Sequence, residues 1–163
     1  MNEQLVSTIA PRFGLPVELV NAIIQVESEG DPSALRYEPA FYDRYVRGKG
    51  HQVFRPCSRE TEEKARAFSW GLMQVMGQVA REEGFTGPYL AELIEPATGI
   101  EYGCRHLARH ARSFPAPTYG WDAVCAAYNG GKGAVRGPNG FNNPAYPAKV
   151  LKALGGRWPE RRT

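Results

Sequence analysis

Short apolar stripes with helical spacing, each closed by glycine or proline, constrain this chain more than any other feature of its sequence. Trp121, Val124, Cys125 and Tyr128 stand at i, i+3, i+4 and i+7, and the pair Gly130-Gly131 follows at once. This spacing puts apolar side chains on one face of a helix, and glycine commonly ends a helix. Alternation with a period of two, the pattern of a half-buried strand, is almost absent. We therefore predict a mostly α fold with little or no β-structure.

Three of the expected helices can be bounded from local signals. The first spans residues 2–12, where apolar residues recur every four positions. A polar helix capped by Ser58 runs through Ala67, and the pairs Glu60/Lys64 and Glu62/Arg66 are expected to add weak support to it. A third spans residues 72–84 and carries a further apolar stripe.

Length and composition suit one globular domain. The chain has 163 residues, 42% of them hydrophobic and 23% charged, which is enough to bury a sizeable core. We place the domain at residues 1–154 and expect a loose basic tail at residues 155–163. No apolar run approaches the roughly 20 residues that span a bilayer. We expect a monomer with no integral membrane segment.

Charge and cysteine content exclude several classes of protein. The net charge of +3 is too small, and too little interleaved with aromatic residues, to predict binding to nucleic acid. Cys57, Cys104 and Cys125 are an odd set without Cys-x-x-Cys spacing, which argues against a zinc ribbon or a disulfide framework. Cys104 and Cys125 lie on apolar stripes and are expected in the core, while a bridge from Cys57 stays open.

One carboxylate interrupts an apolar stripe. Leu19 and Ile23 lie on the inner face of an amphipathic helix that ends at Gly30, and the next position on that face is Glu27. An unpaired carboxylate in an apolar setting is pushed toward its neutral form, and a protonated carboxyl near neutral pH is suited to general acid catalysis. The alternative is a glutamate at the helix end whose side chain merely reaches water.

Two histidines one helical turn apart, His106 and His110, are the only hint of a metal site. The glutamate that zinc proteases place between such histidines is missing, and no third ligand is evident. We expect both rings to flank the apolar face of their helix. We predict no metal and no cofactor.

Four short motifs follow one another along the chain. They are Glu-Ser at 27–28, Gly-Leu-Met-Gln-Val-Met at 71–76, Ile-x-x-Gly at 100–103 and Ala-Tyr-Asn-Gly-Gly at 127–131. In this order they resemble the soluble lytic transglycosylases and the related goose-type lysozymes, which cleave peptidoglycan. The resemblance covers roughly residues 3–154, and the wording at 36–39 and 69–74 is most similar to phage-encoded muramidase domains. It implies a single lysozyme-like domain acting on peptidoglycan glycan strands.

The resemblance assigns roles residue by residue. Glu27 matches the family's catalytic acid, and the following Ser28 steadies the helix end or the substrate, or simply caps the helix. Gln74 matches a residue that binds a sugar hydroxyl or N-acetyl group, and Met76 lines the pocket unless it is core. Tyr128 would hydrogen-bond the carboxyl of Glu27 or an N-acetyl oxygen, with a buried core tyrosine as the alternative.

Further candidates follow from side-chain chemistry. Asn129 precedes two glycines and either binds substrate or ends its helix in a left-handed conformation. Tyr37 and Trp70 offer flat faces for stacking on sugar rings or for packing in the core. Glu38 precedes Pro39 in an expected loop near the cleft, and we predict that it contacts the substrate. The spacer between the first two motifs is long, so residues 37–68 are expected to form an extra flap beside the cleft.

The mechanism depends on how many carboxylates take part. Goose-type hydrolases tend to place an aspartate where this chain has Met76, and most glycosidases need two carboxylates. With Glu27 alone, the N-acetyl group of the substrate would supply the second function and the product would be a 1,6-anhydro sugar. Glu38 or Asp43 could instead activate water, which would make the enzyme a hydrolase. A glycan-binding module without activity is the remaining alternative.

Location is the last expectation. The first residues, Met-Asn-Glu-Gln, show no basic segment followed by an apolar one, so no secretory signal is expected. A phage enzyme made in the host cytoplasm, and released by the lysis machinery or carried in the virion, would reach the wall without such a signal. So would a bacterial enzyme exported by a specialised machine, but the motif sequences favour a phage.

Overall fold

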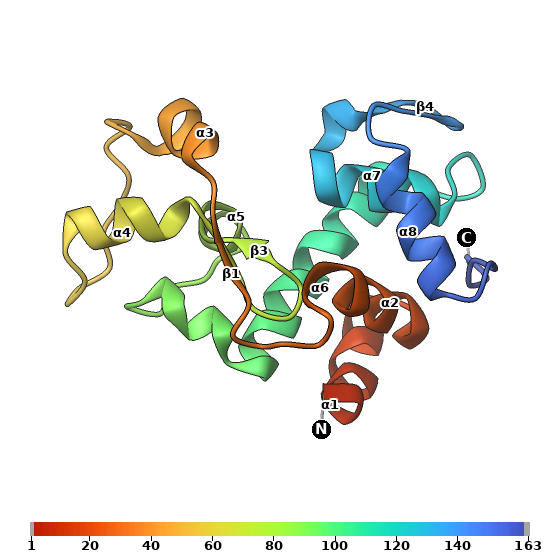
Figure 1. The fold of residues 1–163 in the computed structure, drawn as a ribbon, viewed down its shortest axis with the longest axis horizontal. Coiled ribbons are helices and arrows are strands. Elements are labelled where there is room, and N and C mark those ends of the chain that lie inside the picture. Colours follow the sequence, from red (N-terminus) through yellow and green to blue (C-terminus); the bar gives the residue numbers. More distant parts are fainter. Residues whose placement is uncertain (1, 162–163) are drawn as a thin grey trace. The chain divides into compact units, whose positions relative to one another are not determined.

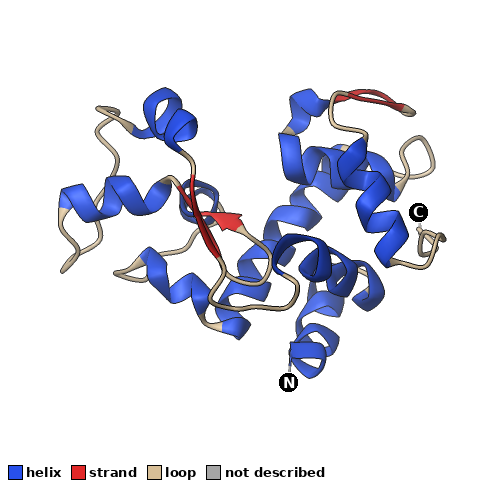
Figure 2. Cartoon of the chain, viewed as in Figure 1, coloured by secondary structure: helices blue, strands red, loops and turns tan. Residues whose placement is uncertain are grey.

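The computed structural model describes residues 2–161. Helices make up 57% of these residues and strands 8%, which confirms the mostly α, lysozyme-like fold. The chain forms two compact units, one of residues 1–26 and 104–163 and the other of residues 27–103. Figure 1 labels the elements, and Figure 2 shows that the strands are short. Within residues 2–161, no helix is both long enough and apolar enough to cross a membrane.

The first unit is helical. Its elements are α1 (Asn2–Ile9), a 3₁₀ turn (Ala10–Phe13), most of α2 (Val17–Ser28), the second half of α6 (Pro96–Ser113), α7 (Trp121–Gly130), a 3₁₀ turn (Lys132–Ala134), a hairpin of β4 (Val135–Gly137) and β5 (Gly140–Phe141), and α8 (Ala145–Ala153). Helix α8 packs on α7. The fully buried apolar side chains of this unit that are larger than alanine are Val6, Leu19, Val20, Ile23, Cys104, Leu107, Val124, Cys125 and Val150.

The first expected helix is shorter than predicted. It is α-helical only to Ile9 and tightens into the 3₁₀ turn before Gly14. Pro11 explains the change, since proline cannot donate the backbone hydrogen bond that would continue an α-helix. The expected ends of α2 and α7 are confirmed within two residues.

The second unit mixes short helices with one small sheet. Its elements are β1 (Leu35–Tyr37), α3 (Pro39–Phe41), a π-helical turn η2 (Tyr42–Val46), α4 (Arg59–Arg66), β2 (Phe68–Trp70), β3 (Val75–Met76), α5 (Gly77–Glu82), a 3₁₀ helix η3 (Leu90–Ile94) and the first half of α6. The sheet order is β1-β2-β3 and both pairings are antiparallel.

The helix expected at residues 72–84 is wrong in its first half. Residues 68–76 form the β2–β3 hairpin, and only residues 77–82 are helical. Two positions in the turn explain this: Gly71 and Gln74 have φ values of 66° and 48°, in the left-handed region that a helix does not use. A Cβ atom at Gly71 would also lie 2.6 Å from the carbonyl oxygen of Leu93, so only glycine fits there.

A buried charge cluster holds α4 against α5. The side chain of Glu62 is fully buried, and its Oε1 accepts a hydrogen bond of 2.9 Å from Arg81 Nε while Oε2 accepts one of 2.8 Å from Arg81 Nη2. Arg66 Nε lies 2.9 Å from Oε1 as an ion pair, without the alignment of a hydrogen bond. The expected pair of Glu62 and Arg66 is therefore present, but it lies in the interior and is shared with Arg81. Ser58 does cap α4, because its Oγ accepts from Thr61 N at 3.1 Å.

Candidate functional site

The catalytic candidate Glu27 lies in the last turn of α2. The preceding residues on its face, Leu19 and Ile23, are fully buried, and Glu27 itself is half-buried. Directly after the helix, Glu29 adopts a φ of 55° and Gly30 one of 86°, which turns the chain away. The apolar stripe therefore does lead to this carboxylate at the helix end.

Ser28 joins the helix end to the β2–β3 turn. Its Oγ donates a hydrogen bond of 2.8 Å to the carbonyl oxygen of Leu72, 44 positions further along the chain. The hydroxyl thus reaches another segment. This contact fixes the residue after Glu27 to the motif Gly-Leu-Met-Gln, so two of the four motifs meet within one unit.

Gln74 holds that turn in place through its side chain. Its Nε2 donates to the carbonyl oxygens of Ala34 at 3.0 Å and Gly71 at 2.9 Å, and its Oε1 accepts from Ser69 Oγ at 3.0 Å. Both amide hydrogens are therefore committed inside the protein, which leaves an acceptor position on Oε1 for a ligand. The left-handed backbone of Gln74 costs about 1–2 kcal/mol, which these bonds offset.

Met76 and Trp70 frame the hairpin. Met76 lies half-buried in β3, paired with Ser69, and Gly77 begins α5 directly after it. Trp70 is only 8% exposed, and its indole Nε1 donates to the carbonyl oxygen of Ala65 at 3.0 Å. This burial favours the packing role for Trp70 over stacking on a sugar.

Tyr37 belongs to an aromatic cluster on the sheet. Its ring lies 5.0 Å from that of Phe68, which in turn lies 5.6 Å from Trp70. The ammonium group of Lys64 stands 5.7 Å from the centre of the Tyr37 ring, within the range of a cation–π contact. Tyr37 is half-buried, so part of its ring remains accessible.

The two carboxylates that could activate water both pair with arginines. Glu38 Oε1 accepts a hydrogen bond from Arg36 Nε and forms an ion pair with the same guanidinium. Asp43 Oδ1 lies 2.7 Å from Arg47 Nη2, one helical turn away, with more than half of both side chains exposed. Each carboxylate therefore already has an arginine as its partner through one of its oxygens.

Tyr128 and Asn129 lie in the last turn of α7, in the other unit. Tyr128 is 8% exposed, and its ring centre is 5.2 Å from that of His106. Asn129 is exposed and helical, and its Oδ1 accepts from Asn143 Nδ2 at 2.9 Å. The left-handed conformation considered for Asn129 is wrong: Gly131, two residues later, takes the positive φ of 73°.

The histidine pair is partly interior. His106 and His110 place their Nε2 atoms 3.3 Å apart with the rings edge to face, and His110 is only 3% exposed, so the expectation that both rings flank the apolar face is wrong for His110. In the described chain no three His, Cys, Asp or Glu side chains gather as a metal site requires. All three cysteines are buried with free thiols, so Cys57 forms no bridge.

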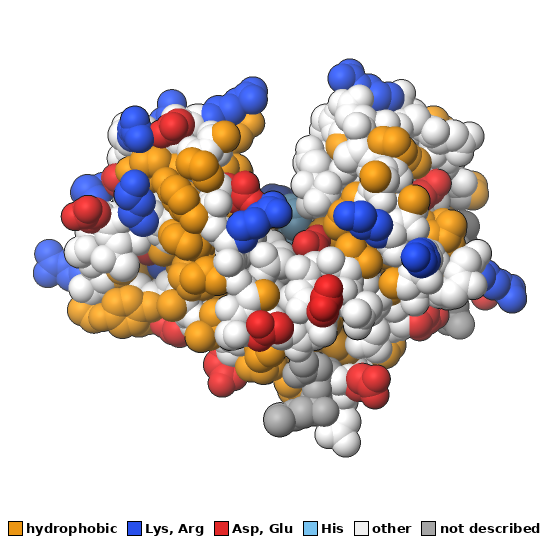
Figure 3. All heavy atoms as spheres, viewed as in Figure 1, with side chains coloured by type: hydrophobic (Ala, Val, Ile, Leu, Met, Phe, Trp, Pro, Cys, Tyr) orange, Lys and Arg blue, Asp and Glu red, His pale blue; other side chains and the backbone are white. Residues whose placement is uncertain are grey.

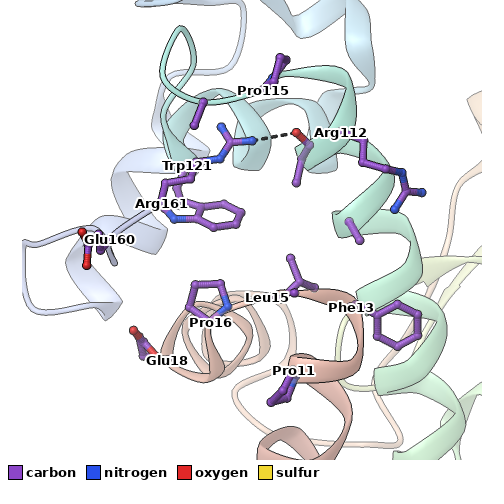
Figure 4. Close-up of a pocket in the computed structure, with 14 residues that line it drawn as sticks. Pro11, Phe13, Leu15, Pro16, Glu18, Arg112, Pro115, Trp121, Glu160 and Arg161 are labelled. Carbon is purple, nitrogen blue, oxygen red and sulfur yellow. Dashed lines mark hydrogen bonds between the residues drawn. The ribbon is translucent and has the colours of Figure 1, made fainter. Parts of the chain in front are cut away.

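A cavity of about 750 Å³ lies within the first unit, apart from all the predicted site residues. Figure 4 shows Leu15 and Pro16 on one side of it and Trp121 on the other. Arg161 closes one end, where its guanidinium donates to four backbone carbonyl oxygens, those of Ala111, Phe114, Tyr119 and Gly120. The segment expected as a loose tail thus includes an anchored arginine. No sequence signal pointed to this role.

Comparison with known proteins gives the chain a family. No curated protein matches it. A family model described as the transglycosylase SLT domain matches residues 4–144, a stretch that contains all four motifs and both ends of the Ser28–Leu72 hydrogen bond. Because the match covers most of the sequence, the chain belongs to the transglycosylase SLT domain family.

Proposed function

We propose that this chain is a lytic transglycosylase that cleaves the β-1,4 bond between N-acetylmuramic acid and N-acetylglucosamine, with Glu27 as the single catalytic carboxyl group. The family supports peptidoglycan cleavage in general. The observation that carries the specific proposal is the position of Glu27, half-buried at the end of an apolar stripe and next to the serine that ties the helix to the Gly-Leu-Met-Gln turn.

The reaction needs no second protein carboxylate. Glu27 would donate its proton to the glycosidic oxygen as the bond from that oxygen to C1 breaks, and the N-acetyl oxygen of the muramoyl sugar would stabilise the positive charge at C1. The resulting carboxylate would then take the proton of the C6 hydroxyl, whose oxygen bonds to C1. One C–O bond breaks and one forms, no water is consumed, and the product is a 1,6-anhydro sugar.

The pairing of the alternative bases supports this mechanism over hydrolysis. Glu38 and Asp43 each have one carboxylate oxygen engaged by an arginine, so neither is an unpaired base. Met76 occupies the position where the goose-type hydrolases tend to have an aspartate, and it supplies no carboxylate.

Two measurements test the proposal. Mass spectrometry of digested peptidoglycan should show muramoyl ends lighter by one water than reducing ends; a majority of hydrated ends would establish a hydrolase instead. Glu27→Gln should lower the rate of wall clearing at least about 100-fold, the scale of general acid catalysis, with an unchanged melting temperature. Glu29→Gln, two residues away and exposed, is the matched control and should retain activity within about twofold.

We also propose that the enzyme is encoded by a phage and reaches the wall from the host cytoplasm or from a virion. The support is the amino-acid sequence at residues 36–39 and 69–74, which is most similar to that of phage-encoded muramidase domains. Expression in a bacterial cytoplasm should leave cells intact until chloroform permeabilises the inner membrane, and should then lyse them. Lysis without permeabilisation would contradict this route.

A further inference from the structure

The net charge of the chain is concentrated in one segment. Residues 43–66 hold seven Lys and Arg against four Asp and Glu, whereas the rest of the chain has thirteen of each. Within this segment, residues 44–59 run from the turn η2 to the first residue of α4 and contain no acidic residue; they are here called the basic loop. Its five cations are all exposed: Arg44, Arg47, Lys49, Arg55 and Arg59. The whole excess of +3 therefore belongs to residues 43–66.

Hydrogen bonds hold the middle of the basic loop against both of its ends. His51 Nε2 lies 3.1 Å from the carbonyl oxygen of Tyr45, and the carbonyl oxygen of His51 accepts from Arg59 Nη1 at 3.3 Å. The carbonyl oxygen of Gln52 accepts from Arg66 Nη2 at 2.9 Å. These contacts fix residues 51–52, in the middle of the loop, to η2 through Tyr45 and to α4 through Arg59 and Arg66.

The buried charge cluster of Glu62, Arg66 and Arg81 packs against the inner side of the basic loop. The guanidinium of Arg81 lies 3.9 Å from the centre of the Phe54 ring, which anchors the middle of the loop. Glu62 is fully buried and matched by Arg66 and Arg81, so it does not neutralise the charges on the surface. Figure 3 shows Lys and Arg side chains across the region of α3 and α4.

The charges of the loop are only partly compensated. Arg47 pairs with Asp43 at 2.7 Å, and Arg59 lies at a looser 3.8 Å from Glu63. Arg44, Lys49 and Arg55 form no ion pair with any described residue. Tyr45, 47% exposed, lies beside Arg44, whose guanidinium is 5.1 Å from the ring centre.

We propose that the basic loop binds a flexible phosphodiester polymer carried by the cell wall. This inference rests on the proposed function, which brings the protein to peptidoglycan. Guanidinium groups suit phosphate oxygens because they donate two parallel hydrogen bonds. Single cations spread over an exposed loop match a chain with one negative charge per repeat, and Tyr45 is too small an apolar surface to anchor the loop in a lipid bilayer.

Binding to wall sacculi tests the proposal. The Glu27→Gln protein is used so that the sacculi stay intact during sedimentation. One sample of sacculi retains its poly(glycerol phosphate), and a second has lost it by hydrofluoric acid treatment. We expect at least tenfold tighter binding to the first sample at 50 mM NaCl. A rise to 200 mM NaCl should weaken this binding by roughly tenfold or more, since counterion release makes affinity for a polyanion fall steeply with salt.

A matched pair of triple variants locates the interaction. Replacing Arg44, Lys49 and Arg55 together by Gln should reduce binding to the polymer-bearing sacculi at least tenfold. Replacing the exposed Lys132, Lys149 and Lys152 of the other unit by Gln removes the same net charge and should change binding less than twofold. Circular dichroism melting curves verify that all variants are folded.

The outcomes separate this inference from the proposed activity. Equal binding to both sacculi, an equal loss in both triple variants, or tighter binding to anionic vesicles or to a single-stranded oligonucleotide would overturn the inference. If the proposed function were wrong but this inference right, the wild-type protein would bind the polymer, and mass spectrometry of digested peptidoglycan would show no anhydro ends.

Discussion

The strongest prediction concerns the buried carboxylate of Glu62. Replacing it by Gln keeps its size but removes the charge that two guanidinium groups share. The new amide nitrogen would face the donors of Arg81 in place of an acceptor. Arg81 also donates to the carbonyl oxygens of Phe85 and Gly87, so it cannot swing out to water without losing those bonds as well.

The stability lost in Glu62→Gln follows from the burial of the three charged side chains. Glu62 is 0% exposed and the side chains of both arginines are 4% exposed, so the variant leaves two cations without their counter-charge in the interior. Breaking a buried pair in this way costs about 3–5 kcal/mol. For a chain of this length, about 2–4 °C is lost per kcal/mol, so the melting temperature should fall by roughly 6–20 °C.

Urea unfolding and hydrogen exchange measure the effect. Glu63→Gln is the matched control, because this neighbouring glutamate pairs with Arg59 at 3.8 Å near the surface and its loss should cost about 1 kcal/mol or less. Amides of α4 and α5 should lose most protection in Glu62→Gln. The reasoning is refuted if the free energies of unfolding of the two variants lie within about 1 kcal/mol of each other, the upper value of an ion pair near the surface.

Three further sets of measurements test Gln74, Arg161 and Cys125. Gln74→Ala should lower the free energy of unfolding in urea by about 2–3 kcal/mol, because three hydrogen bonds are lost. Gln74→Gly should lower it by about 1 kcal/mol less, because glycine accepts the positive φ of this position. Equal losses in the two variants would contradict the strain argument. Arg161→Ala should cost about 2–4 kcal/mol through its carbonyl contacts, whereas the exposed Arg157→Ala should stay within about 0.5 kcal/mol. Burial, with a smaller contribution from Asp122, raises the pKa of the Cys125 thiol above its ordinary 9.0. Peptide mapping should therefore show that Cys125 resists iodoacetamide at pH 8 in native protein and is labelled only after unfolding. Because the raised pKa favours the neutral thiol in the fold, the free energy of unfolding should fall as the pH rises above 9, and a flat profile there would contradict it.

Local pattern was sufficient for much of the helical framework and for the order of the motifs. The apolar stripes of α2 and α7 and the glycines after them bound these helices correctly, because helix spacing and helix ends depend on neighbours within four positions. The same stripe placed Glu27 at a helix end. The order of the four motifs, with Gly-Leu-Met-Gln following Glu27-Ser28, was also evident from the sequence.

Tertiary structure alone decided the hairpin and the buried charges. The apolar stripe at residues 72–79 reads as a helix, but β2 pairs with β1 from more than thirty positions away, and the left-handed Gln74 is held by Ala34. Helix spacing alone pairs Glu62 with Arg66, but the burial of this pair depends on Arg81 and the basic loop, which cover it. Ser28 finds Leu72 across 44 positions. Such contacts depend on which distant segments pack together, and neither spacing nor composition encodes that directly, since burial and long-range hydrogen bonds exist only once the chain has folded.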